Sequence, residues 1–226
     1  SDIVGDPVDM IASGPVSPDS STCADALAAA EKYALRLSDT ARGLLAQETP
    51  KTADNVTVRV TGSVRELCAA AAKACRDLGY TPEILTNCEQ GVAREVGARL
   101  GALARENASC GMPRAFILGG ETVVRLTGNG KGGRNQELAL AAAAEIAGAE
   151  NVVVFSVGSD GTVGPTDAAG GLADGGTVER LAAAGKTVAD VLQNNDAYHA
   201  LRDTGDLIIT GPTGTNVNDF AAALVR

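Results

Sequence analysis

The sequence contains no tryptophan, and aromatic residues make up only 3% of its 226 residues, whereas apolar residues make up 45%. A core of this composition must be built from Ala, Val, Leu and Ile, and such a core suits helices packed closely on a sheet. A chain of this length is large enough for one substantial domain, or for a domain and part of another.

Basic residues are also scarce. There are 19 Lys and Arg residues against 28 Asp and Glu residues, so the net charge is −9. A general nucleic-acid binder needs clustered cations that neutralise phosphates, and this charge balance argues against one. No apolar run is long enough to span a bilayer, so we expect no membrane contact. Any phosphate site must be local.

The Cys and His spacings that are typical of zinc sites are missing as well. The five cysteines include no C-x-x-C pair, and His199 is the single histidine. Cys68 and Cys75 lie in an Ala-rich stretch and are interpreted as small core residues. The first ten residues lack the basic and apolar regions of a signal peptide. Together these features predict a reducing, cytoplasmic setting.

The hydrophobic pattern predicts two parts. A helix from Cys23 to about Leu37 and a shorter helix before Pro50 are followed by a linker. From Val56 the chain alternates: "VTVRV", "EILT" and "AFIL" are expected strands, and helices begin at the Ser63 capping box and near Gln90. This alternation predicts an α/β fold with a mostly parallel sheet flanked by helices.

The later residues are richer in loops. "ETVVRL", "NVVVFSV" and "DLIIT" are expected strands, "RNQELALAAAAEIAG" is an expected helix, and "FAAALV" is an edge strand or a short helix. Further short helices are expected near Val178 to Ala184 and Ala197 to Arg202. Three strands end in polar, Gly-rich loops, namely "GGE" after Leu118, "GSDG" after Val157 and "TGPTGTN" after Ile209. Ligands of open α/β sheets bind beyond the carboxyl ends of strands, so we expect these loops to converge on a site.

The stretch "GNGKGGRNQE", Gly128 to Glu137, fits the spacing G-x-G-x-x-G between an expected strand and a helix. Such a loop binds either a dinucleotide or another phosphate through backbone amides at a helix N-terminus. Lys131 and Arg134 favour a transferring phosphoryl group, because close packing in a dinucleotide turn leaves little room for long cations. A glycine-rich connection with solvated charges remains an alternative. The candidate phosphate-binding glycines are Gly128, Gly130, Gly132 and Gly133.

Other loop residues are candidates for supporting roles. Asp160 and Asp167 in "SDGTVGPTD" suit Mg²⁺ or a substrate hydroxyl, although each could instead form a turn or cap a helix. Glu121 could orient Lys131 or Arg134, or simply begin a strand. The loop after Ile209 could line a nucleotide or substrate pocket through Thr210, Gly211, Thr213, Gly214, Thr215 and Asn216, and turn chemistry explains it equally well.

Five motifs occur in an order that resembles a known family. "SDIVGDPVDMIASGPVSPD", "GGETVVRLTGNGKGGRNQE", "SVGSDGTVGPTDAAGG", "NNDAYHAL" and "GDLIITGPTGTNVND" resemble class II glycerate kinases, whose carboxyl-terminal part is the MOFRL domain. The resemblance covers the chain from its first residues nearly to its last, but it matches only the later half of the family. It implies that residues 1–54 end a Rossmann-like first domain and that residues 55–226 form the MOFRL-containing second domain.

The resemblance implies transfer of the γ-phosphoryl group of ATP to D-glycerate, giving 2-phosphoglycerate, with Mg²⁺. Some relatives carry the label hydroxypyruvate reductase, so an NAD(P)H-dependent reductase is the second hypothesis. A lysine implicated in catalysis would lie in the missing amino-terminal domain. We therefore expect the isolated chain to be inactive, and a non-catalytic binding domain is the third hypothesis. Homodimerisation stays open.

Overall fold

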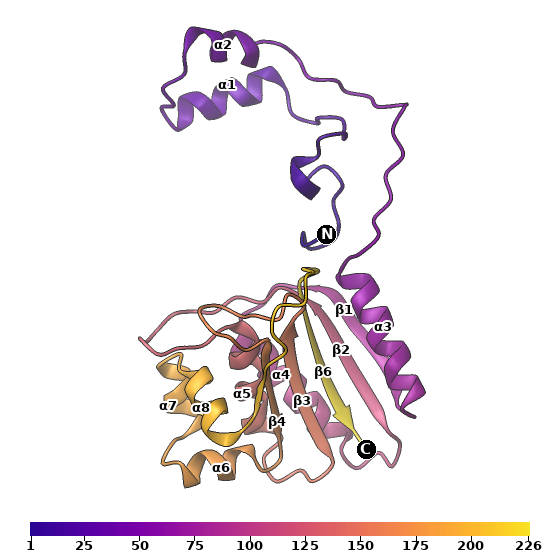
Figure 1. Ribbon diagram of the computed structural model, residues 1–226, viewed down its shortest axis with the longest axis vertical. Helices are drawn as coiled ribbons and strands as arrows, with labels where there is room; N and C mark the ends of the chain where they lie inside the picture. The colour runs from indigo at the N-terminus through magenta and orange to yellow at the C-terminus, as the bar shows by residue number, and fades with distance from the viewer. The chain divides into compact units, whose positions relative to one another are not determined.

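The computed structural model describes all 226 residues and divides them into two compact units (Figure 1). The smaller unit is Asp6–Val60, and the larger one combines Ser1–Gly5 with Thr61–Arg226. The assignment of residues 1–54 and 55–226 to two domains of a longer protein stays a prediction, because this division concerns contacts within the chain alone. No helix is long and apolar enough to cross a membrane.

The smaller unit is helical. Its elements are a 3-10 turn at Ile11–Ser13 and the helices α1, Cys23–Lys32, and α2, Asp39–Leu45. Helix α1 stops short of Leu37 because the chain enters the left-handed region at Ala34, where φ is 47°. The strand expected at "VTVRV" is absent. No neighbouring strand is there to pair with it, and Val58 is exposed.

The larger unit is built on a six-stranded mixed sheet with the order β1-β2-β6-β3-β4-β5. The α/β fold class is confirmed, but the expected parallel character holds only in part. The pair β1 and β2 is parallel, and every other pair is antiparallel. The strands are β1, Thr81–Glu89; β2, Arg114–Gly120; β3, Val152–Gly158; β4, Gly170–Asp174; β5, Leu207–Ile208; and β6, Asp219–Val225.

The position of β6 explains the mixed pairing. The sequence predicted an edge strand or a helix for "FAAALV", but β6 lies between β2 and β3 and runs opposite to both. Its Ala222 and Ala223 are fully buried, on opposite faces of the sheet, so small side chains allow close packing on both sides. As a result β1, β2, β3 and β5 still point the same way, and their carboxyl ends share one edge.

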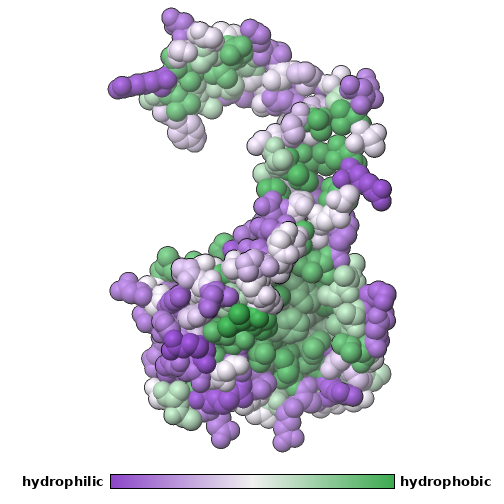
Figure 2. All heavy atoms as spheres, in the orientation of Figure 1, coloured by the Kyte–Doolittle hydropathy of each residue, from purple (hydrophilic) through white to green (hydrophobic).

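Helices cover the two faces unequally. Helix α3 packs on one face against Ile117 and Phe220, and α4 and α5 pack on the other against Phe116 and Val154. The short helices α6, α7 and α8 pack against the outer side of α5. Apolar residues gather on the face beside α3 (Figure 2), where the rings of Phe155 and Phe220 lie 5.6 Å apart. The helices are α3, Val64–Asp77; α4, Ala93–Asn107; α5, Arg134–Glu145; α6, Thr177–Ala183; α7, Val188–Gln193; and α8, Ala197–Thr204.

The segment "ETVVRL" is not the strand that its β-branched residues predicted. It makes one isolated bridge, Val123 to Val92, and leaves the sheet after Gly120. Gly120 has φ of 150°, and a Cβ there would lie 2.2 Å from the Glu89 carbonyl oxygen, so the chain turns at a position that only glycine fits. The expected strand "DLIIT" is reduced to Leu207–Ile208, and β4 and α7 were not expected.

Candidate functional site

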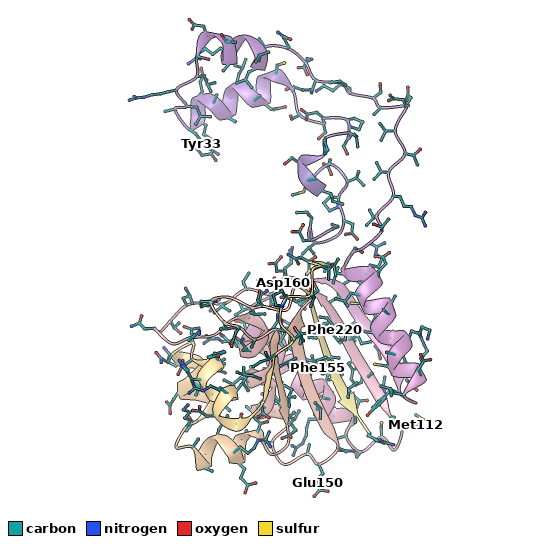
Figure 3. The ribbon with its side chains drawn as sticks, in the orientation of Figure 1. Tyr33, Met112, Glu150, Phe155, Asp160 and Phe220 are labelled. Carbon is teal, nitrogen blue, oxygen red and sulfur yellow. The ribbon has the colours of Figure 1, made fainter.

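The three Gly-rich loops do converge at the edge where β2, β3 and β5 end. The Thr213 amide donates to the Asp160 carbonyl at 3.2 Å, and the Ser159 amide donates to the Asn218 carbonyl at 3.1 Å. Asn218 Nδ2 in turn donates to Glu121 Oε2 at 3.1 Å. Figure 3 shows Asp160 at this edge of the sheet. The expected convergence of the loops is confirmed, and that they form a ligand site stays a prediction.

Arg134 lies at the centre of this edge, as the first residue of α5. Its Nε and Nη2 donate to the two carboxylate oxygens of Asp219, with Nη2 3.1 Å from Oδ1. Its Nη1 lies 3.2 Å from Glu121 Oε1. Asp219 begins β6 and pairs with both Gly120 and Gly158, so the sheet register places this carboxylate between the ends of β2 and β3. Because a guanidinium has five N–H donors, two remain for a ligand.

Because of burial, the charge on Asp219 and the charge on Arg134 depend on each other. The Asp219 side chain is 8% exposed and that of Arg134 is 31% exposed. Burial raises the pKa of Asp219, and the hydrogen bond and charge of Arg134 oppose that rise. Burial also disfavours charge on Arg134, but Asp219, Glu121 and Asp160 outweigh it and raise the pKa of the guanidinium. The cation is therefore fixed in place by carboxylates and is partly open to solvent.

Arg134 and Glu121 line a cavity of about 830 Å³. Gly132 and Gly133, from the loop before α5, line the same cavity, and their backbone amides make no hydrogen bond within the protein. The first amides of α5 add to this set, because a helix leaves its N-terminal N–H groups without intrahelical partners. An anion in the cavity would meet a guanidinium, two loop amides and a helix N-terminus.

The first half of the glycine loop has a different role. The amides of Gly128 and Lys131 donate to Asn195 Oδ1 and Asp196 Oδ1, each at 2.9 Å, and the Gly130 amide donates to the Asn194 carbonyl at 2.8 Å. These amides are already satisfied. A Cβ at Gly128 would lie 2.4 Å from Asn194 Cα, so close packing against 194–196 explains the glycine there. Gly128 and Gly130 thus hold the loop in place.

Lys131 points to a second polar cluster. Its Nζ lies 4.5 Å from the centre of the Tyr198 ring, and it does not line the cavity. The Tyr198 hydroxyl donates to Asp167 Oδ1 at 2.7 Å, and this bond holds the pKa of Asp167 below its usual value. The structure therefore separates the sequence candidates into two sets, Arg134 with Glu121 and Asp160, and Lys131 with Asp167.

Asp160 and the loop after β5 support the edge of the site. Asp160 Oδ1 accepts from the Thr162 amide at 3.0 Å. Neither Asp160 nor any of the candidates between Thr210 and Asn216 lines the cavity. Their hydrogen bonds stabilise the loops themselves, for example from Thr213 Oγ1 to the Ser159 carbonyl. No group of three or more His, Cys, Asp or Glu side chains is arranged to hold a metal ion.

Several residues of the site were not found from the sequence. Asp219 was missed because β6 was not expected to be central, although a carboxylate directly before "FAAALV" was a usable signal. Glu137 is 2% exposed and forms an ion pair with Arg94, and it also accepts from Asn195 Nδ2 at 3.3 Å. Glu137 and Asn195 also line the cavity, and the network joins α4 and α5 to the segment that holds the glycine loop.

The fold and the site define an α/β protein with a cavity, lined by Arg134 and Glu121, at the carboxyl ends of its strands. Residues 114–219 match the MOFRL family, and residues 1–46 match a domain of unknown function, DUF4147. The chain is 47% identical to a D-glycerate 2-kinase from Thermotoga maritima, over 100% of this chain and 55% of that protein. It is 38% identical to a glycerate 2-kinase from Pyrococcus horikoshii, over 100% of this chain and 54% of that protein.

Solved structures agree with these matches. The crystal structure of the Thermotoga maritima glycerate kinase superposes with a TM-score of 0.96, over 100% of this chain and 56% of that one.

A relative from Agrobacterium vitis, 38% identical over 100% of this chain and 53% of its own length, carries the name hydroxypyruvate reductase. The chain belongs to the glycerate 2-kinase family that contains the MOFRL domain. It spans about half the length of the curated relatives described here.

Proposed function

We propose that the protein carrying this chain transfers the γ-phosphoryl group of ATP to D-glycerate and forms 2-phosphoglycerate. The observation that carries the proposal is the placement of Arg134 in a large cavity, between Asp219 and Glu121, beside the unbonded amides of Gly132 and Gly133. The names of two relatives supply the reaction class, and the cavity offers a guanidinium and unbonded amides of the kind that stabilise charge in phosphoryl transfer.

In this proposal Arg134 stabilises the charge on the transferring phosphoryl group through its two remaining N–H donors. The carboxylates of Asp219 and Glu121 fix the guanidinium in advance, so little reorganisation is needed during the reaction. The amides of Gly132 and Gly133 and the N-terminus of α5 contact phosphate oxygens. Lys131 supplies a second cation when its flexible stem turns away from the Tyr198 ring.

Of the two candidate magnesium ligands, we propose Asp160. Mg²⁺ in kinases is commonly held by one or two carboxylates together with phosphate oxygens and water, so a single carboxylate beside the phosphate site fits. Asp160 acts electrostatically on Arg134, whereas Asp167 is hydrogen-bonded to Tyr198 and lies near Lys131. When bound, Mg²⁺ neutralises phosphate charge. The loop Thr210 to Asn216 acts by holding Asp160 through the Thr213 amide.

The dinucleotide hypothesis has less support. A dinucleotide turn follows a strand directly, but the segment before Gly128 is irregular, and the amides of Gly128 and Gly130 are occupied by the 194–195 segment. The hydroxypyruvate reductase name of one relative keeps this hypothesis worth an experiment.

We also propose that activity needs a further domain, since the Thermotoga maritima relative is almost twice as long as its matched region. The isolated chain is then a binding domain without activity. A cytoplasmic location is supported by five free cysteines. Homodimer formation remains a hypothesis.

ADP formation by the complete protein tests the function. ADP release that depends on D-glycerate, without NADH oxidation when hydroxypyruvate is supplied, is the expected result. Oxidation of NADH without ADP release would overturn the proposal in favour of the reductase.

A further inference from the structure

The cavity that contains Arg134 also has an apolar wall, formed by Val123, Val124 and Leu126. Val123 is 54% exposed and Leu126 is 79% exposed, so both side chains face open space instead of the core. Neither phosphate nor a small hydroxy acid gains from such a wall. Exposed apolar residues that line a cavity with a few polar groups are typical of a binding site for a larger, partly apolar ligand.

The backbone of this wall is available for hydrogen bonds. The amide and carbonyl of Val123 bond to Gly91 and Ala93, at 3.0 Å and 2.8 Å. In contrast, the N–H and C=O groups of Val124 and Leu126 have no partner in the protein. A nucleobase has apolar faces and an edge of hydrogen-bond donors and acceptors, and adenine presents an N–H donor beside a ring-nitrogen acceptor. Apolar side chains next to unbonded backbone groups match both features.

The wall is held in place at both ends. Val123 is fixed by its bridge to Val92. At the other end, Asn195 Nδ2 donates to the Arg125 carbonyl at 3.1 Å, and the Thr127 amide donates to Asn195 Oδ1 at 2.7 Å. A segment outside any helix or strand is thus restrained without using the groups of Val124 and Leu126, and such preorganisation lowers the entropic cost of binding.

We propose that the adenine base of ATP packs against Val123, Val124 and Leu126, while its phosphates reach Arg134, Gly132 and Gly133. This assignment rests on the proposed kinase function, because it divides one cavity between the two ends of the same nucleotide. A volume of about 830 Å³ suits a ligand of this size.

The test compares Leu126→Ala with Leu78→Ala in the complete protein. Leu78 is 74% exposed and lies at the end of α3, outside the cavity, so it is a matched control. Calorimetric titration measures the Kd of ATP and of inorganic tripolyphosphate, which lacks the base. We expect Leu126→Ala to weaken ATP about tenfold, from the loss of buried apolar surface, and to leave tripolyphosphate unchanged. Leu78→Ala should change neither Kd.

The other outcomes are decisive. Two results would contradict the packing of adenine against the apolar wall and leave the kinase function standing. They are an unchanged Kd for ATP in Leu126→Ala and an equal weakening of ATP and tripolyphosphate binding. If the parent protein binds no ATP and forms no ADP with D-glycerate, the proposed kinase function is wrong. The proposed adenine site is then wrong as well, because it rests on that function.

Discussion

The ion pair of Arg134 and Asp219 predicts an asymmetric response to mutation. In Arg134→Met the Asp219 carboxylate stays buried and loses its counterion, and breaking a buried pair in this way costs about 3 kcal/mol. In Asp219→Asn the arginine keeps Glu121 as a partner and is partly exposed, so the cost is smaller, about 1 kcal/mol. The double variant removes the unpaired charge and should be more stable than Arg134→Met alone.

The asymmetry has a pH dependence of known sign. Burial raises the pKa of Asp219, and Arg134 opposes that rise, so Arg134→Met raises this pKa further. A carboxyl group whose pKa is higher in the folded state binds protons more tightly when folded. Stability is then fully present at low pH and is lost as pH rises through the two pKa values. The deficit of Arg134→Met relative to the parent should therefore shrink as pH falls through the raised pKa of Asp219.

Urea denaturation followed by circular dichroism measures these differences, since the chain has no tryptophan to report its unfolding by fluorescence. Equal losses in the two single variants would refute the reasoning. So would a double variant no more stable than Arg134→Met, or a deficit that grows on acidification, because each would mean that Asp219 does not depend on Arg134.

Two further predictions concern Asp160 and the segment that holds the glycine loop. Asp160→Asn should raise the Mg²⁺ concentration needed for half-maximal rate. Asp167→Asn should not, because the carboxylate of Asp167 is hydrogen-bonded to Tyr198. Equal shifts of the two variants in a magnesium titration would contradict the choice of Asp160. Asn195→Ala removes the acceptor for the Thr127 and Gly128 amides and should raise the KM for ATP by roughly tenfold, with a smaller change in the KM for D-glycerate. Initial rates will show this, with Asn129→Ala as the exposed neighbour for comparison, and a parallel rise in both KM values would argue against a loop-specific role.

Local sequence patterns predicted the elements that depend on local chemistry. Ser63 caps α3 by accepting from the Arg65 amide, so the predicted helix start is confirmed. The bonds differ from those of a capping box, because Ser63 Oγ donates to Glu66 Oε2. The convergence of the loops also followed, because strands that point the same way end at the same edge. These features need only the period of apolar residues and the residues at helix ends.

Long-range pairing could not be predicted in the same way. Nothing in "FAAALV" itself indicates that β6 lies between β2 and β3, and this position brings Asp219 to Arg134. The glycine spacing was ambiguous for the same reason. The glycines in the first half of the loop are required by contacts with Asn195 and Asp196, more than 60 residues away. Only the structure shows that these glycines are packed, whereas the amides of Gly132 and Gly133 are free.

The central claim is that the guanidinium group of Arg134 stabilises the transferring phosphoryl group. The most direct test is the kcat for glycerate-dependent ADP formation by the complete protein and its Arg134→Lys variant, with the exposed Arg76→Lys as control. Lysine keeps the charge but loses the planar fork held by Asp219 and Glu121. The account predicts a fall in kcat of roughly 100-fold for Arg134→Lys and none for the control. A kcat within about twofold of the parent, less than 0.5 kcal/mol in the barrier, would contradict it.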